Sequence, residues 1–307
     1  MVNNNENYEK AIELLEYEVR TIRKSKEFLL GSKIYRWKQR LLHFNVKQII
    51  TIARRHFQLR KRYLYFDIEP PKVEVDCKGI PVINFQNSDR ITIYTCITNG
   101  YDSPKRPLLA YSNCDYILYT DDLTMTAQGW QVRPIPEKLT SLKPADINRY
   151  LKFHPTEFFN TRFTIYIDGN IKLLAGISKF IDRISPKTGL AIYRHPWRDC
   201  IRTEVRICQI LGKGDAKNLQ QQVDAYLKEG FPLHFGLLEA SVIVSDLHNP
   251  RSTELLTQWY QEHAVRGGGR DQISLPYILW KNHLTVSDIG ILGEDIDQSL
   301  LVRREGH

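Results

Sequence analysis

Short runs of β-branched and aromatic residues alternate with longer amphipathic stretches over most of this chain. The β-rich runs lie at residues 91–98, 115–121, 163–169, 189–195 and 240–246. Helical patterns lie near residues 146–160, 202–211, 216–229, 252–264 and 271–282. Strands that alternate with helices are typical of a mostly parallel sheet covered by helices on both faces. The pattern therefore predicts an α/β domain over residues 91–290, with ligands bound at the carboxyl ends of its strands.

The chain before this domain has a different pattern. Residues 6–30 predict a helix whose apolar positions recur at intervals of three and four, as in a coiled coil, although fewer than four heptads are present. This spacing permits a homodimer without requiring one. A second helical stretch follows, so we predict a basic helical segment over residues 1–62. We interpret residues 63–90 as a linker with a short hairpin, and residues 291–307 as a C-terminal tail.

The positive charge of the chain is concentrated in that N-terminal segment. The 307 residues carry a net charge of +8, but residues 20–62 alone hold 14 Lys and Arg against one acid. Three interpretations are open for this segment: packing on the domain, binding to an anionic membrane surface, and binding to nucleic acid. The last is the least favoured, because no recognisable nucleic-acid-binding motif accompanies the charge.

Several classes of protein are disfavoured by what the sequence lacks. No apolar run approaches the roughly 20 residues that span a bilayer, and the first residues do not form a signal peptide. The five cysteines are odd in number and have no CxxC spacing, which suits a reducing compartment. We expect a cytoplasmic protein, with a peripheral location on the inner face of the membrane as the alternative.

The strongest local motif is the stretch TIYIDGNIKL, residues 164–173. A buried strand ends at Asp168, Gly169 permits a turn, and Asn170 offers a second oxygen two positions on. Such oxygens can hold Mn²⁺ or Mg²⁺ against a diphosphate, although an amide is a weaker ligand than a carboxylate. Asp-Gly is also common in ordinary turns.

Other polar residues follow the neighbouring strands. Thr98 and Asp102 follow the first strand and Asp121 follows the second, where a nucleotide-binding sheet holds the base and ribose. Arg149 and Lys152 share a helix face suited to phosphate, unless that face is simply solvated.

Further along the chain, three clusters of polar residues complete the candidate site. His195 is a candidate for phosphate contact, and His248 for a third metal ligand, although a buried structural histidine is the alternative for each. Glu239 precedes a strand and is a candidate catalytic acid. The Gly267–Gly269 triplet predicts a mobile lid or hinge before Arg270-Asp271-Gln272, where Asp271 would otherwise cap the next helix.

Taken together, these motifs resemble a glycosyltransferase-like family formerly known as a domain of unknown function, with plant mucilage- and pectin-related and bacterial members. The resemblance covers about residues 91–285, and the matching stretches are YTCITNGYD, YTDD, RYLKFHP, YIDGNI, HPWRDCIRTE, FPLHFGLLEASVIVSDLHN and RDQISLPYILWK. It implies a GT-A-like, Rossmann-related fold, a nucleotide-sugar donor and a glycan or polysaccharide acceptor. Asp168 and Asn170 would occupy the DxD position.

The same resemblance assigns two further elements. Arg149, Lys152 and His154 match the basic element before the DxD position, and Arg270, Asp271 and Gln272 match the element that ends the domain. We therefore expect a hexosyl- or related transferase acting on a nucleoside diphosphate sugar, with a UDP-sugar favoured. Asp271 would serve as the base in an inverting reaction, whereas Asp271 or Glu239 would face the sugar in a retaining one.

Two other functions remain open from the sequence. A hydrolase acting on a lipid amide or a glycoside would also use paired acids and histidines. A non-catalytic protein could bind a glycan and a membrane through the basic helices.

Overall fold

The computed structural model describes residues 74–75, 81–83, 89–108, 110–174 and 176–305. The chain divides into two compact units, residues 1–68 and 69–307, and the described residues all belong to the second. The predicted basic helices of residues 1–62, with the membrane surface and the dimer that depend on them, lie outside the described residues. Among the described residues, no helix is long and apolar enough to cross a membrane.

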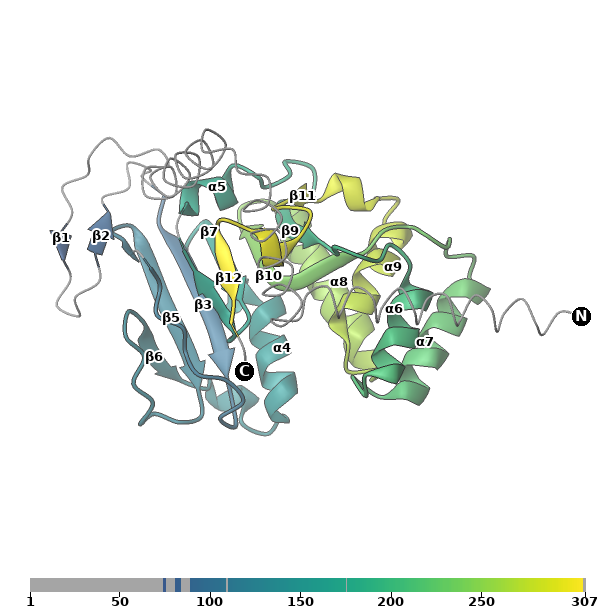
Figure 1. Cartoon of the computed structure of the whole chain (residues 1–307), viewed down its shortest axis with the longest axis horizontal. Coiled ribbons are helices and arrows are strands. Elements are labelled where there is room, and N and C mark those ends of the chain that lie inside the picture. Colours follow the sequence, from purple (N-terminus) through teal and green to yellow (C-terminus); the bar gives the residue numbers. More distant parts are fainter. Residues whose placement is uncertain (1–73, 76–80, 84–88, 109, 175, 306–307) are drawn as a thin grey trace, which may run out of the picture. The chain divides into compact units, whose positions relative to one another are not determined.

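The largest sheet has seven strands in the order β11-β9-β10-β7-β3-β5-β6 (Figure 1). Their bounds are β3 Ile91–Ile97, β5 Cys114–Thr120, β6 Gln131–Pro134, β7 Phe163–Ile167, β9 Leu190–Arg194, β10 Leu238–Asp246 and β11 Gly290–Ile291. All neighbouring strands are parallel except that β10 is antiparallel to both β7 and β9. The predicted α/β class and the mostly parallel sheet are thus confirmed, with one reversed strand.

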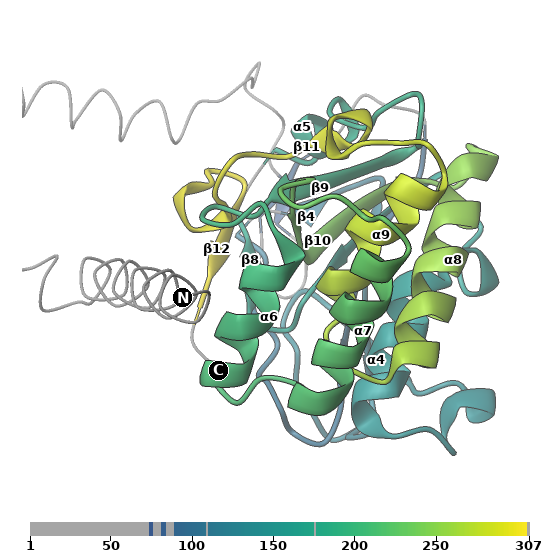
Figure 2. The same cartoon turned by 90° about the vertical axis from the view of Figure 1, so that its right-hand side faces the viewer.

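The central strands are apolar because both of their faces are covered. Every residue of β3 is buried, and alternate residues belong to two separate hydrophobic clusters. Tyr94 and Tyr166 pack with helices α4, α6, α7, α8 and α9, which lie on one face of the sheet (Figure 2). Ile93 and Ile165 pack on the other face with the short helix α5 (Ile177–Ile181) and with strands β8 (Ile171–Leu173) and β12 (Val302–Arg304). The prediction of helices on both faces is therefore correct only in part.

The predicted helical stretches match observed helices with shifted ends. Their bounds are α4 Pro144–Phe153, α6 Ile201–Ile210, α7 Ala216–Lys228, α8 Pro250–Arg266 and α9 Ser274–Lys281, whereas the short helix α5, Ile177–Ile181, was not predicted. The expected helix over 146–160 ends at Phe153, because Pro155 cannot continue it and begins a separate 3₁₀ turn. The stretch from residue 271 opens with a 3₁₀ turn, η3 (Asp271–Ile273), before α9.

The described residues after β11 belong to the domain. β12 (Val302–Arg304) pairs antiparallel with β8 (Ile171–Leu173), which follows the predicted DGN turn directly. The predicted boundary at residue 290 lies within β11, so the interpretation of residues 291–307 as a tail is wrong as far as residue 305. Strands of two or three residues are too short to show a period in sequence, which explains the error.

A small second sheet has the order β1-β2-β4. β1 (Glu74–Val75) and β2 (Pro81–Ile83) pair antiparallel, in agreement with the hairpin predicted within residues 63–90. β4 (Ala110–Tyr111) then pairs parallel with β2.

Candidate functional site

The sheet topology brings most of the predicted site residues to one edge. β3, β5, β7 and β9 run in the same direction, so their carboxyl ends meet there, and the reversed strand β10 begins at that edge. The residues that follow or begin these strands are Thr98, Asp102, Asp121, Asp168, Asn170, His195 and Glu239. We call this the carboxyl edge.

Asp168, the acid of the DGN turn, is partly exposed at this edge. Its backbone N–H donates to the carbonyl of Ser241 at 2.9 Å, which continues the pairing of β7 with β10 by one residue. Its Oδ1 lies 2.9 Å from the hydroxyl of Tyr166, and that hydroxyl is also 3.0 Å from Asn148 Oδ1. The side chain of Asp168 is 37% exposed. The carboxylate is thus held in place on one side and open on the other.

Gly169 leaves room for a second carboxylate beside the DGN turn. A Cβ atom at position 169 would lie 2.9 Å from both Cβ and Oδ2 of Asp102, which is too close for any larger residue without a shift of the loop. The loop after β3 therefore places Asp102 directly against the DGN turn.

The DGN turn and Asp102 supply oxygen atoms of the kind that Mg²⁺ and Mn²⁺ bind, and metal binding there remains a prediction. In the described part of the chain, no three His, Cys, Asp or Glu side chains are grouped so that they could hold a metal ion. Mg²⁺ and Mn²⁺ at phosphate-transfer sites commonly take one or two carboxylates and complete their shell with phosphate and water. Asp168, Asp102 and the amide oxygen of Asn170 offer a set of that kind.

Lys152 lies behind Asp168, inside the protein. Its ammonium is 4.0 Å from Asp168 Oδ1 and 2.7 Å from Asp271 Oδ2, and its side chain is only 4% exposed. Burial by itself raises the pKa of Asp271, but the charges of Lys152 and Arg149 outweigh this and hold it well below its ordinary value. Asp271 is therefore a stable anion and a weak base, and its main contact is this buried ion pair.

Arg149 is also used within the protein. Its Nη1 donates to the carbonyl of Ala145 at 3.0 Å, and its Nη2 donates to the carbonyl of Gly269 at 2.7 Å. The prediction that Arg149 and Lys152 lie on one face of their helix is correct. Both side chains, however, contact the segment that contains Gly269 and Asp271. Phosphate binding by this pair remains a prediction, and the internal contacts weaken it.

Glu239 has a different environment from Asp271. Its carboxylate forms an ion pair with Arg304 of β12 and accepts a hydrogen bond from Ser241 Oγ at 3.2 Å. Burial raises the pKa of Glu239 above its ordinary value, and Arg304 opposes that shift. Arg304 also lies 3.4 Å from Asp297 through its Nε. Arg304 was not predicted, because the sequence assigned it to a tail.

The remaining predicted residues have structural contacts. Thr98 Oγ1 donates to the carbonyl of Pro144 at 3.1 Å, and Asp121 accepts from the backbone N–H of Asn99 at 2.9 Å. These bonds shape the loops after β3 and β5. A nucleoside could still contact both residues at this edge, so their predicted role stays open.

His195 and its neighbours form a buried charged network. Nε2 of His195 lies 3.0 Å from Arg198 Nη2 and 3.6 Å from Glu204 Oε2. Arg270 is close enough to Glu204 on α6 for their charges to interact. Gln272 is also buried, and its Nε2 has no hydrogen-bond partner among the described residues.

The three glycines before Arg270 have contacts that differ from those expected of a free lid. Gly267 ends α8 in the left-handed conformation, with φ of 62°, and its N–H donates to the carbonyl of His263. The carbonyl of Gly268 accepts from Asp215 N at 3.0 Å, and that of Gly269 accepts from Arg149. Asp271 also lies within η3 rather than at its N-cap, which is Arg270, so the expected capping role is wrong.

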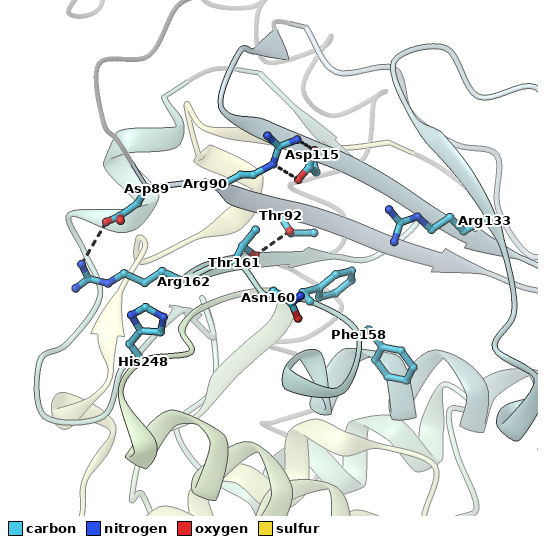
Figure 3. A pocket seen from close by; sticks show the side chains of 11 residues that line it. Asp89, Arg90, Thr92, Asp115, Arg133, Phe158, Asn160, Thr161, Arg162 and His248 are labelled. Carbon is cyan, nitrogen blue, oxygen red and sulfur yellow. Dashed lines mark hydrogen bonds and ion pairs between the residues drawn. The ribbon is translucent and has the colours of Figure 1, made fainter.

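His248 lies at the opposite edge, and its prediction as a third metal ligand is wrong. In the register of β10 with β7, Val242 pairs with Ile167 but Asp246 pairs with Phe163, so the chain leaves β10 where β7 begins. The sequence could not show that β10 is reversed. At this amino edge, His248 lines an open pocket of about 450 Å³ together with Asp89, Arg90, Thr92, Asp115, Arg133, Phe158, Phe159, Asn160, Thr161 and Arg162 (Figure 3).

These features define an α/β protein of the glycosyltransferase-like class, with a mostly parallel sheet, one reversed strand and acids gathered at the carboxyl edge, as the GT-A-like prediction expects. The family model for the TOD1/MUCI70, glycosyltransferase-like domain matches residues 146–302, about half of the chain, and the chain belongs to this family.

A curated relative in Arabidopsis thaliana carries the name "Probable hexosyltransferase MUCI70". It is 30% identical over 127 residues, which cover 38% of this chain and 22% of that protein. The match thus spans about a fifth of the length of that relative.

Solved glycosyltransferase structures resemble the chain only distantly. The WbbM bifunctional glycosyltransferase in its apo form aligns with a TM-score of 0.39 and 8% identity, over 64% of this chain and 38% of that one. Apo mouse xyloside xylosyltransferase 1 aligns with a TM-score of 0.36 and 11% identity, over 66% of this chain and 83% of that one. The galactosyltransferase LgtC, in complex with donor and acceptor sugar analogues, aligns with a TM-score of 0.36 and 10% identity, over 61% of this chain and 70% of that one. Scores of this size support no comparison of individual residues.

Proposed function

We propose that this chain is a glycosyltransferase that moves a hexosyl or related sugar from a nucleoside diphosphate sugar, most simply a UDP-sugar, to a hydroxyl group of a glycan or polysaccharide. The observation that carries the proposal is the DGN turn at the carboxyl edge. There Asp168 is held by Tyr166 but remains open to solvent, and Gly169 leaves room for Asp102 beside the turn. Membership of a glycosyltransferase-like family supports the same reading.

The donor would bind with its diphosphate at this turn. Asp168, Asp102 and Asn170 would hold Mn²⁺ or Mg²⁺, which would supply positive charge for the departing diphosphate. Lys152 keeps Asp168 and Asp271 from repelling each other, because its ammonium lies between them at 4.0 Å and 2.7 Å. The protein therefore holds the exposed carboxylate fixed in direction.

Glu239 is the better of the two candidate bases. A base is most effective when its pKa lies near the working pH. Burial moves the pKa of Glu239 upward, whereas Lys152 and Arg149 keep that of Asp271 well below its ordinary value. In an inverting reaction, Glu239 would take the proton of the acceptor hydroxyl as its oxygen bonds to the sugar and the sugar–diphosphate bond breaks. In a retaining reaction, Glu239 would instead face the sugar.

Nucleotide-dependent stabilisation tests the donor site. We expect UDP or GDP with Mn²⁺ to raise the unfolding temperature by roughly 5–10 °C at 100 times the dissociation constant, since binding then adds about 2.7 kcal/mol. Asp168→Ala should remove this shift and the release of UDP from UDP-hexoses. Asp115→Ala, at the opposite edge, is the matched control and should change neither.

Other outcomes would point elsewhere. A shift that needs no metal would keep the transferase and remove Asn170 as a ligand. Binding of no nucleotide, together with unchanged activity in Asp168→Ala, would contradict the proposal. Release of a sugar or of an acyl group without any nucleotide would favour the hydrolase.

A further inference from the structure

A departing diphosphate needs a cation that can reach it, and the two basic residues predicted for this purpose are engaged. Lys152 is buried against Asp271, and both terminal nitrogens of Arg149 donate to backbone carbonyls. Withdrawing either cation would leave buried partners unsatisfied, which is costly. A cation in contact with solvent at the carboxyl edge would serve the donor better.

Arg304 meets this description. It lies on β12 and pairs with Ile171 of β8, which follows Asp168 by three residues in the chain. The next residue continues the contact, because Glu305 N donates to the carbonyl of Asn170 at 2.9 Å. The side chain of Arg304 is 36% exposed. β12 therefore places the Arg304 guanidinium close to the DGN turn.

The guanidinium also has donors to spare. Its Nη2 contacts Glu239 and its Nε lies 3.4 Å from Asp297, while Nη1 makes no hydrogen bond to the described residues. The charge of Asp168 also acts on Arg304. Three acids thus surround one half-open arginine, and a guanidinium can bind a phosphate group through two parallel hydrogen bonds.

We propose that Arg304 binds the diphosphate of the donor and stabilises the charge that it gains as the sugar departs. The inference rests on the proposed function and adds to it a residue that lies two positions beyond the segment matched by the family model. In the resting protein the same side chain neutralises Glu239. When the diphosphate engages the spare donors of Arg304, the negative phosphate offsets part of the arginine's charge, so Glu239 is less neutralised and becomes a stronger base. Donor binding thus prepares the acceptor reaction.

Calorimetric titration of three variants tests the proposal with UDP, uridine and inorganic pyrophosphate as probes. Arg304→Gln should weaken UDP and pyrophosphate binding by about 10- to 100-fold, the loss expected for charged hydrogen bonds. Uridine, which has no phosphate, should bind within about twofold of wild type. Arg304→Lys should restore part of the affinity. Arg303→Gln removes an equal charge from the neighbouring exposed position and should bind every probe as wild type does.

Glu239→Gln supplies a second, independent measurement. It removes the resting partner of Arg304 without removing the arginine, so pyrophosphate should bind more tightly than to wild type.

Three results would overturn the inference. These are unchanged pyrophosphate affinity in Arg304→Gln, an equal loss for UDP and uridine with a lowered unfolding temperature, and weaker pyrophosphate binding in Glu239→Gln. Failure of the proposed function gives a different pattern. Wild type would then bind pyrophosphate in an Arg304-dependent way but bind no nucleotide more tightly than pyrophosphate.

Discussion

The two edges of the seven-stranded sheet handle ionic side chains in opposite ways. At the amino edge, Arg90 contacts Asp115 through two hydrogen bonds of 2.6 and 2.7 Å, and the Arg90 side chain is 66% exposed. At the carboxyl edge, Lys152 and Asp271 form a comparable contact of 2.7 Å almost entirely out of water. The distances are nearly the same, and only the surroundings differ.

This difference in exposure decides how much each ion pair contributes to the stability of the fold. Exposed ion pairs contribute about 0–1 kcal/mol, because water and salt screen them. Removing one partner of a buried pair costs about 3–5 kcal/mol, because an uncompensated charge is left inside the protein. Buried charges also keep their directions, as a site that stabilises a developing charge requires. The carboxyl edge thus has the properties of a reaction site, whereas the amino edge mainly has those of a surface.

The largest expected effect is that of Lys152→Met. This change leaves Asp271 buried without its cation, and we expect the free energy of unfolding to fall by about 3–5 kcal/mol. Urea denaturation followed by circular dichroism measures it. The double variant Lys152→Met, Asp271→Asn should recover much of the loss, because no unpaired charge remains. A loss below about 1 kcal/mol in the single variant would show that the two edges do not differ.

A smaller effect concerns His263 on α8, which is buried near Asp271. Burial lowers the pKa of His263 to about 4, whereas an unfolded histidine titrates near 6.5. The folded protein therefore favours neutral His263, and the stability that follows is present above pH 6.5 and is lost as the pH falls toward 4. At about 1.4 kcal/mol per pKa unit, the loss is about 3 kcal/mol.

The variant His263→Gln isolates this contribution. Glu239, with its raised pKa, acts in the opposite direction over part of the same range, so the difference between wild type and variant is the useful quantity. Urea unfolding should be measured at pH values from 4 to 7.5. As the pH is lowered, the free energy of unfolding of wild type should fall relative to that of the variant. Parallel curves for the two proteins would show that His263 is not held neutral by burial.

The smallest effect is expected at the amino edge. Arg90→Gln breaks the contact with Asp115 that lines the pocket of Figure 3, and we expect a change of no more than about 1 kcal/mol in unfolding free energy. Stability should depend less on salt in the variant than in wild type. A loss near that of Lys152→Met would break the comparison between the edges.

Much of the fold was predictable because it rests on local patterns. The β-branched and aromatic run of β3 and the amphipathic stretch of α7 are patterns that a sequence shows directly. Asp168 was identified for the same reason, since an acid that ends a buried strand can be recognised without knowing which strands are its neighbours. The short strands β8 and β12 were missed because three residues show no period.

The site was predicted less completely, and His248 and Arg304 show why. His248 follows a strand just as Asp168 does, but β10 runs in the opposite direction and carries it to the other edge. Arg304 is brought beside the DGN turn only by pairing between β12 and β8, which are some 130 residues apart in the chain. Strand direction and long-range pairing depend on contacts between distant residues, and no local pattern contains them.

The sequence by itself determined the alternation of strands and helices, the acid and glycine of the DGN turn, and the resemblance to a glycosyltransferase-like family. Tertiary structure alone decided that Lys152 is a buried partner of Asp271 and that Glu239 and Asp271 differ as bases. The physical reason is that composition sets which groups carry charge, whereas burial and neighbouring charges set the free energy of ionising each one. Those surroundings exist only when the sheet has brought its strands together.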